Sequence, residues 1–151
     1  MGKLIDIAQT YLTSDEWHFE KVEGKDLIVC SVKGDNASFK IAIRANEDTE
    51  RVTVFCTSPN LVPEDKRSIV AEFITRATYG LSFGNIEMDM SDGEVRAKSA
   101  VDIEGGVLTP KMVGSLISCS VNLMDKYYPG LMAILFSNIT AFDAIQQVEK
   151  K

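Results

Sequence analysis

The feature that most limits how this chain can fold is the dipeptide Asp92-Gly93, which lies between two runs of alternating apolar and polar residues. Asp-Gly between such runs is typical of a two-residue β-hairpin turn. If these two residues form the turn, Glu87 lies opposite Lys98 and Asp89 lies opposite Arg96. Opposite charges at paired positions contribute about 0.2–1 kcal/mol each. The same register brings four apolar side chains together on the other face: Met90 opposite Val95, and Met88 opposite Ala97.

The rest of the chain alternates between strand-like and helix-like periods. Turn-forming residues separate short runs of period-two alternation, which lie at about residues 17–22, 26–33, 38–45 and 51–57. Apolar residues at helical spacing predict helices over about residues 4–12, 63–80, 109–128 and 131–148. The predicted order is helix, four strands, helix, two strands and two helices, which is typical of an α+β fold. Because no repeat or linker interrupts this order, we expect a single domain over residues 1–151.

The segment MDKYYPGLMAILF, residues 124–136, predicts a change of direction between the last two helices. Proline lacks an N–H group and its ring clashes with the preceding turn, so Pro129 stops or kinks a helix. We therefore expect a structural corner in which the Asp125 carboxylate and the tyrosine hydroxyls make hydrogen bonds. Its members are Asp125, Tyr128, Pro129 and Gly130.

The residues that follow this corner, Leu131 to Phe136, are apolar nearly all round, which a surface helix is not. Either both sides are buried within one chain, or one side contacts a second subunit or a client protein. The run is far shorter than the roughly 20 residues that a membrane-spanning helix needs. The candidate partner or dimer surface comprises Leu131, Met132, Leu135, Phe136, Ile139 and Phe142.

Composition narrows the classes of partner. The chain has 151 residues and a formal net charge of -6, which argues against nucleic acid and against an anionic membrane surface. Its first residues lack the apolar core of a secretory signal. Three cysteines without a C-x-x-C pair, Cys30, Cys56 and Cys119, indicate buried thiols in a reduced, cytoplasmic protein.

No group of residues predicts a catalytic, cofactor-binding or metal-binding site. Carboxylates gather around the hairpin, but Met88 and Met90 stand where a calcium loop needs oxygen ligands. The string Gly-Leu-Ser-Phe-Gly around Ser82 matches a nucleophile elbow, yet here a helix precedes the serine and a strand follows it, which is the reverse of that motif.

One chemical alternative stays open. His18 is the single histidine, and Cys30 or Cys56 can meet it in space although they lie apart in the chain. The alternative function is therefore a thiol-dependent enzyme or a small-ligand binder with a cleft near His18, between the sheet and the last helices.

The segment from Gly84 to Phe136 resembles the YbjN-domain family. The resemblance rests on the Asp-Gly hairpin, the strand after it, and the Asp-x-x-Tyr-Pro element before the last helix. The matching residues are Gly84, Asp89, Asp92, Gly93, Glu94, Val95, Leu108, Asp125, Tyr128 and Pro129. This resemblance implies a fold similar to that of type III secretion chaperones, which is a twisted antiparallel β-sheet with helices packed on one side. Such proteins are often dimeric. The family is described as bacterial sensory transduction regulators without established catalytic residues, so no catalytic site carries over.

These observations together predict a non-enzymatic protein-binding module, regulatory or chaperone-like, in a bacterial cytoplasm. We expect a homodimer with an unidentified protein partner, and neither nucleic acid nor membrane as a partner. Contact is expected at an exposed sheet edge or face, or at residues 131–142. A type III secretion chaperone in the strict sense is a third alternative, because the size and the acidity fit it.

Overall fold

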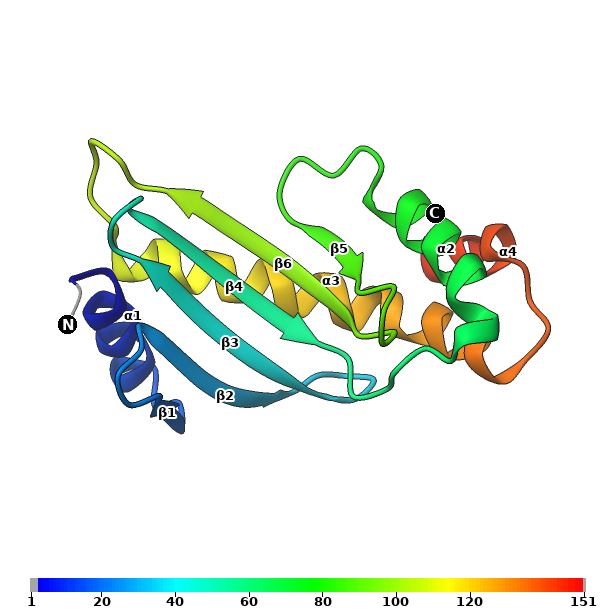
Figure 1. The fold of residues 1–151 in the computed structure, drawn as a ribbon, viewed down its shortest axis with the longest axis horizontal. Helices are drawn as coiled ribbons and strands as arrows, with labels where there is room; N and C mark the ends of the chain where they lie inside the picture. Colours follow the sequence, from blue (N-terminus) through cyan, green and yellow to red (C-terminus); the bar gives the residue numbers. More distant parts are fainter. Residues whose placement is uncertain (1–2, 151) are drawn as a thin grey trace.

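The computed structural model describes residues 3–150, which form a mixed α+β structure in the predicted order of elements (Figure 1). The elements are α1 (Lys3–Ser14), β1 (Phe19–Lys21), β2 (Leu27–Lys33), β3 (Ser38–Asn46), β4 (Arg51–Thr57), the short 3-10 helix η1 (Glu64–Lys66), α2 (Arg67–Thr78), β5 (Asn85–Met88), β6 (Val95–Asp102), α3 (Pro110–Phe136) and α4 (Ala141–Val148).

The strands form one antiparallel sheet in the order β1-β2-β3-β4-β6-β5. Figure 1 shows α3 crossing behind this twisted sheet, with α1 at one end and with α2 and α4 beside the far end of α3. All four helices therefore leave the face that is turned to the viewer uncovered. The predicted fold class, an α+β fold with a twisted sheet and helices on one side, is confirmed.

Strict alternation along the strands explains which face the helices cover. In β3 the apolar side chains of Phe39, Ile41 and Ile43 are buried, whereas Lys40 and Arg44 point to the opposite, exposed face. The buried residues form two apolar clusters. One lies between the sheet, α1 and the first half of α3, and the other between the sheet, α2, α4 and the second half of α3.

Two buried serines fasten α3 to the middle of the sheet. Ser120 on α3 donates to the carbonyl oxygen of Val54 in β4 at 2.9 Å. Ser99 in β6 donates to the carbonyl oxygen of Leu116 at 2.7 Å, and the two serine hydroxyls are 2.9 Å apart. Within residues 3–150 every buried hydroxyl has a partner, so these two serines hold the middle of α3 to the sheet without the cost of an unsatisfied polar group.

The hairpin forms, but the predicted two-residue turn is wrong. Met88 lies opposite Val95 and Glu87 lies opposite Arg96, so the pairing is shifted by two residues from the predicted register. The Asp89 amide donates to the carbonyl oxygen of Glu94 at 2.9 Å, which closes a longer loop. Because a shift of two residues preserves the faces of both strands, the charged side chains remain together on one face.

Tertiary contacts explain the longer loop. Gly93 has a φ of 84° and accepts a hydrogen bond from the Val62 amide at 2.9 Å, and a Cβ atom at Gly93 would collide with the Val62 backbone. Arg67 donates to the carbonyl oxygen of Met90 at 3.3 Å. The segment after β4 thus binds the hairpin loop and pulls Met90, 56% exposed, away from the predicted apolar face.

The predicted corner at Pro129 and Gly130 is also wrong. Thr109 caps the start of helix α3, where its side chain accepts from the Met112 amide, but the helix runs through Pro129 and ends at Phe136. The chain changes direction over residues 137–140 instead, and the Thr140 side chain caps α4.

A side chain from another part of the fold makes Pro129 tolerable inside the helix. Proline leaves the carbonyl oxygen four residues earlier, that of Asp125, without its helical donor. The side-chain amide of Asn36 donates to this oxygen at 2.9 Å. The freed acceptor is therefore satisfied by the turn between β2 and β3, so the helix continues.

The expected hydrogen bonds of Asp125 and the tyrosines exist, but they join α3 to three other segments. The Asp125 carboxylate accepts from the backbone amides of Asp35 at 3.1 Å and Asn36 at 2.9 Å. The Tyr128 hydroxyl donates to the side-chain oxygen of Asn60 at 2.7 Å. The Tyr127 hydroxyl donates to the Glu149 carboxylate, just after α4, at 2.5 Å.

This arrangement predicts that Asn36 and Pro129 are energetically coupled. In the wild type, Asn36→Ala removes the donor to the solvent-exposed Asp125 carbonyl oxygen, and we expect a loss of about 0.5–1.5 kcal/mol in the free energy of unfolding. In a Pro129→Ala background the restored amide donates to that oxygen, so the same substitution should cost about 1 kcal/mol less. Urea unfolding of the four proteins measures the coupling. The exposed Asn138→Ala is the matched control and should cost the same in both backgrounds; equal costs for Asn36→Ala would contradict the interpretation.

Candidate functional site

The uncovered face of the sheet carries an aromatic side chain at its centre. Phe55 in β4 points to this face, yet it is only 5% exposed although no helix of the described chain lies over it. Its register neighbours are Ala42 in β3 and Lys98 in β6. Something other than a helix therefore shields this ring from water.

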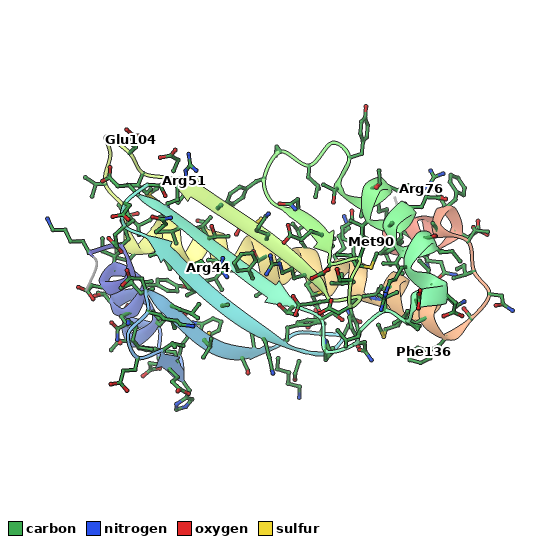
Figure 2. The ribbon with its side chains drawn as sticks, in the orientation of Figure 1. Arg44, Arg51, Arg76, Met90, Glu104 and Phe136 are labelled. Atoms are coloured by element: carbon green, nitrogen blue, oxygen red, sulfur yellow. The ribbon has the colours of Figure 1, made fainter. Side chains whose placement is uncertain are left out.

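Cationic side chains cover the ring. The Arg96 guanidinium lies 4.0 Å from the ring centroid of Phe55, and that of Arg44 lies 5.2 Å from it. Figure 2 shows Arg44 over the middle of the sheet. Lys98 stands directly opposite Phe55, and Lys40 stands diagonally beside it, opposite Thr57. We call Lys40, Arg44, Arg96 and Lys98 the cation ring; cations over an aromatic face are attracted by its quadrupole.

A single carboxylate forms ion pairs with the two members of the cation ring that lie in β6. Glu87 in β5 pairs with Arg96 at 2.6 Å and with Lys98 at 2.7 Å. Burial by itself would raise the pKa of Glu87, but hydrogen bonds from Lys98 and Arg96 and their charges hold it below its usual value. Glu87 therefore stays ionised, and the two cations in β6 are paired.

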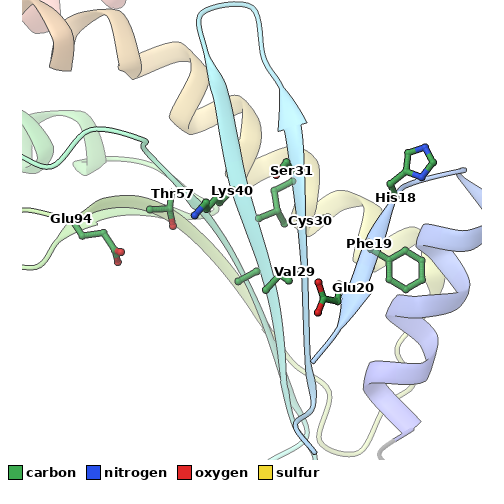
Figure 3. A pocket seen from close by; sticks show the side chains of 11 residues that line it. His18, Phe19, Glu20, Val29, Cys30, Ser31, Lys40, Thr57 and Glu94 are labelled. Carbon is green, nitrogen blue, oxygen red and sulfur yellow. The ribbon is translucent and has the colours of Figure 1, made fainter. Parts of the chain in front are cut away.

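A cavity of about 760 Å³ adjoins the cation ring on the same face. Its lining side chains come from β1 to β4, from the residue before β1 and from the hairpin loop. They include His18, Glu20, Ser31, Lys40, Thr57 and Glu94 (Figure 3). The volume falls within the roughly 300–1,000 Å³ of typical ligand sites. A concave surface thus exists near His18, but it lies on the uncovered face of the sheet and not between the sheet and the last helices, where the alternative placed its cleft.

The thiols near this cavity are not arranged as nucleophiles. Cys30 also lines the cavity, but Figure 3 shows the His18 ring pointing away from Cys30. Burial raises the pKa of the Cys30 thiol to about 11. Burial, with the nearby Asp125 and Cys30, raises that of Cys56 to about 12. Because the thiolate is the nucleophile, both sulfur atoms are poor ones at neutral pH.

The predicted partner surface at residues 131–142 is only partly exposed. Leu131 is 2% exposed and belongs to the apolar core, while Met132, Leu135 and Ile139 are half-buried against it. Phe136 is 76% exposed, and Phe142 is 51% exposed with the Arg76 guanidinium 5.4 Å from its ring centroid. The second half of α3 is apolar all round mainly because α2, α4 and the sheet pack around it.

A bare sheet edge was missed by the sequence analysis. β5 pairs only with the first half of β6 and begins opposite Lys98, so residues 99–102 of β6 have no described strand on that side. The Ile103 amide donates to the carbonyl oxygen of Glu50, and the Val95 carbonyl oxygen accepts from the Ser58 amide. The odd-numbered residues of β6 therefore direct their backbone groups toward β4. Alternation then directs the backbone N–H and C=O groups of Ala100 and Asp102 outward.

An apolar pocket of about 270 Å³ lies beside this edge. Its lining includes Phe83, Val101, Met112 and Leu116, and Phe83 is 46% exposed. The edge arises because β5, NIEM, is half as long as β6, VRAKSAVD, whereas in the sequence the alternation before the turn continues to Met90. The pocket itself depends on the crossing of α3, which no local pattern gives.

Neither metal chemistry nor a membrane span is indicated by the described part of the chain. Over residues 3–150, no three His, Cys, Asp or Glu side chains are grouped in a way that could hold a metal ion. Among the helices of this same region, none has the length and apolar character needed to cross a bilayer.

The fold and these surfaces define a small α+β protein with helices on one side of a twisted sheet and a bare edge beside an apolar pocket. The structure is similar to the crystal structure of YbjN, "a putative transcription regulator from E. coli", with a TM-score of 0.62, 12% identity, and coverage of 87% of this chain and 88% of that chain. It is also similar to the HopA1–SchA chaperone–effector complex, with a TM-score of 0.52, 14% identity, and coverage of 79% and 88%. At these identities the likeness concerns the fold.

The sequence matches the YbjN family, described as "Putative bacterial sensory transduction regulator", over residues 5–132. The chain belongs to this family, which confirms the resemblance inferred from residues 84–136 and extends it into the first half of the chain. No curated protein sequence matches the chain.

The raised thiol pKa values predict slow chemical labelling. A rise from 9.0 to about 11 leaves about a hundredfold less thiolate for Cys30 at neutral pH, and Cys56 has still less. Burial also raises the pKa of Cys119. We expect all three native cysteines to react slowly with a disulfide reagent at neutral pH and faster as the pH rises. The urea-unfolded protein is the control, and one rapidly labelled native cysteine would restore the thiol-dependent alternative.

Proposed function

We propose that this protein is a non-enzymatic protein-binding module, regulatory or chaperone-like, that takes an extended segment of a partner protein beside β6. The observation that carries the proposal is the bare edge at residues 99–102 together with the adjoining apolar pocket. Ala100 and Asp102 offer outward backbone donors and acceptors, and an added strand pairs with such groups.

The pocket gives the added strand a reason to choose one register. Side chains of an extended segment alternate between the two faces of a sheet, so every second one would point to the helix side, where Val101 and Met112 line the pocket. An apolar side chain at that position would bury its surface there. The other face of the strand stays open, because Ala100 is small and exposed.

Family and fold support a binding role. The family is described as a regulator, and in one similar structure a chaperone is bound to an effector protein. Raised thiol pKa values speak against the thiol-dependent alternative. Cys30, Cys56 and Cys119 are all free thiols, which supports a reducing compartment such as a bacterial cytoplasm.

Substitution of Ala100 tests the edge. The Ala100 amide points away from β4, so Ala100→Pro removes an outward donor without removing a hydrogen bond of the sheet. Ala100→Thr is the matched control, because it keeps the amide and suits a strand. Peptides are selected from a random displayed library against the wild type, and their affinities are then measured by fluorescence anisotropy. We expect Ala100→Pro to weaken binding by at least about tenfold and Ala100→Thr to leave it nearly unchanged.

Hydrogen exchange gives an independent readout on the wild type. A selected peptide that adds a strand should slow exchange of the Ala100 and Asp102 amides, which have no strand partner in the free protein. Equal peptide affinity for both variants, or unchanged exchange at these two amides, would contradict strand addition.

We also propose that a second copy of the chain packs against residues 131–142, which would make the protein a homodimer. Support comes from the exposed aromatic side chains of Phe136 and Phe142, since large exposed apolar residues favour association. Light scattering should give the mass of two chains for the wild type and of one chain for Phe136→Glu. Tyr79→Glu alters an aromatic residue that is 90% exposed elsewhere and should leave the dimer intact. A wild type that stays monomeric up to its solubility limit would reject this dimer.

A further inference from the structure

The uncovered face of the sheet has a charge opposite to that of the whole chain. The formal net charge is -6, yet the strand alternation directs many cations to this one face. They are Lys33, Lys40, Arg44, Arg51, Arg96 and Lys98, whereas Glu20, Glu87, Asp89, Glu94 and Asp102 are the carboxylates of the same face. The rest of the molecule is correspondingly more acidic.

Two members of the cation ring lack a carboxylate partner among the described residues. The ion pairs within residues 3–150 join Arg96 and Lys98 to Glu87, and otherwise involve Arg51 and Arg76. Lys40 and Arg44 are not among them, and both are exposed. Their charges are therefore available to a partner, and Phe55 and the adjoining cavity lie between and beside them.

The charges decide which occupant fits this face. A second copy docked face to face would bring two cation rings together, and like charges at such an interface are costly. Nucleic acid requires a broadly basic surface to release its counterions, and this chain is acidic as a whole. A short acidic segment can pair with Lys40 and Arg44 without covering the acidic surface outside this face.

We propose that the cation ring binds an acidic segment of the partner protein, with carboxylates at alternate positions of an extended chain. Lys40 and Arg44 are four residues apart in β3, which corresponds to about 13 Å. Carboxylates on every second residue of an extended segment are about 6.6 Å apart, so the first and third span the same distance. Arg96 lies two strands from Lys40, about 10 Å away, and stacks on Phe55 between them.

This inference rests on the proposed protein-binding function but concerns a different surface from the β6 edge. The probe is a fluorescein-labelled peptide of four Thr-Glu repeats, with four Thr-Gln repeats as the uncharged counterpart. Fluorescence anisotropy is measured at low and at physiological salt. The double variant Lys40→Gln/Arg44→Gln removes the unpaired cations. Lys66→Gln/Lys126→Gln changes the net charge equally at sites in η1 and α3, away from the sheet face.

The expected result is binding of the Thr-Glu peptide that weakens with salt, and at least about tenfold weaker binding by the Thr-Gln peptide and by Lys40→Gln/Arg44→Gln. Lys66→Gln/Lys126→Gln should bind like the wild type. Ala100→Pro should also retain the Thr-Glu peptide, which separates this site from strand addition. Equal loss in both double variants, or no binding of the Thr-Glu peptide at all, would overturn the proposal. Tighter binding of a single-stranded oligonucleotide than of the acidic peptide would overturn it in favour of nucleic acid.

Discussion

The contact between Asp125 and the turn that joins β2 to β3 fixes the second half of α3, and the packing of α2 and α4 depends on it. Three atoms of one residue are used: both carboxylate oxygens accept backbone amides of the turn, and the main-chain carbonyl oxygen accepts the Asn36 side chain. Gly34 is part of the same fit, because a Cβ atom there would lie 2.6 Å from the Asp125 carboxylate. The contact lets a helix with an internal proline continue past the end of the sheet. Its second half then provides the surface on which α2 and α4 pack.

All four helices pack on one face of the sheet. The side chains of the other face must therefore make that face compatible with water. Phe55 would be a liability there, since an exposed aromatic ring on a flat sheet face favours aggregation. Arg44 and Arg96 cover the Phe55 ring instead, and Glu87 forms ion pairs with Arg96 and Lys98. The same arrangement that protects the ring leaves Lys40 and Arg44 unpaired.

Much of the fold could be predicted because it depends on local patterns. Alternation in residues 38–45 and 51–57 and the start of a helix near residue 109 depend only on neighbouring residues, and these predictions agree with the structure. The hairpin register and the corner at Pro129 failed for a common reason. Val62 at the loop and Asn36 at the helix supply hydrogen-bonding partners from distant parts of the chain, and each overrides a local preference. The proposed binding surfaces were harder still, because the cation ring unites β3 and β6, which are not neighbours in the sheet, and the edge pocket requires α3 to lie beside β6.

The two proposed contact surfaces meet on one strand, which bears on how a single partner could use both. Lys98 belongs to the cation ring, and Ala100, two residues further along β6, belongs to the bare edge. A segment added beside Ala100 would direct alternate side chains toward the uncovered face, near Lys98, and the others toward the pocket lined by Val101. Acidic residues in the first set would approach Lys98 and apolar residues in the second set would enter the pocket, whereas Lys40 and Arg44 lie two strands further away in β3. Alternating acidic and apolar residues are therefore the sequence pattern that this geometry favours in a partner, and such a pattern suits an extended segment better than a helix.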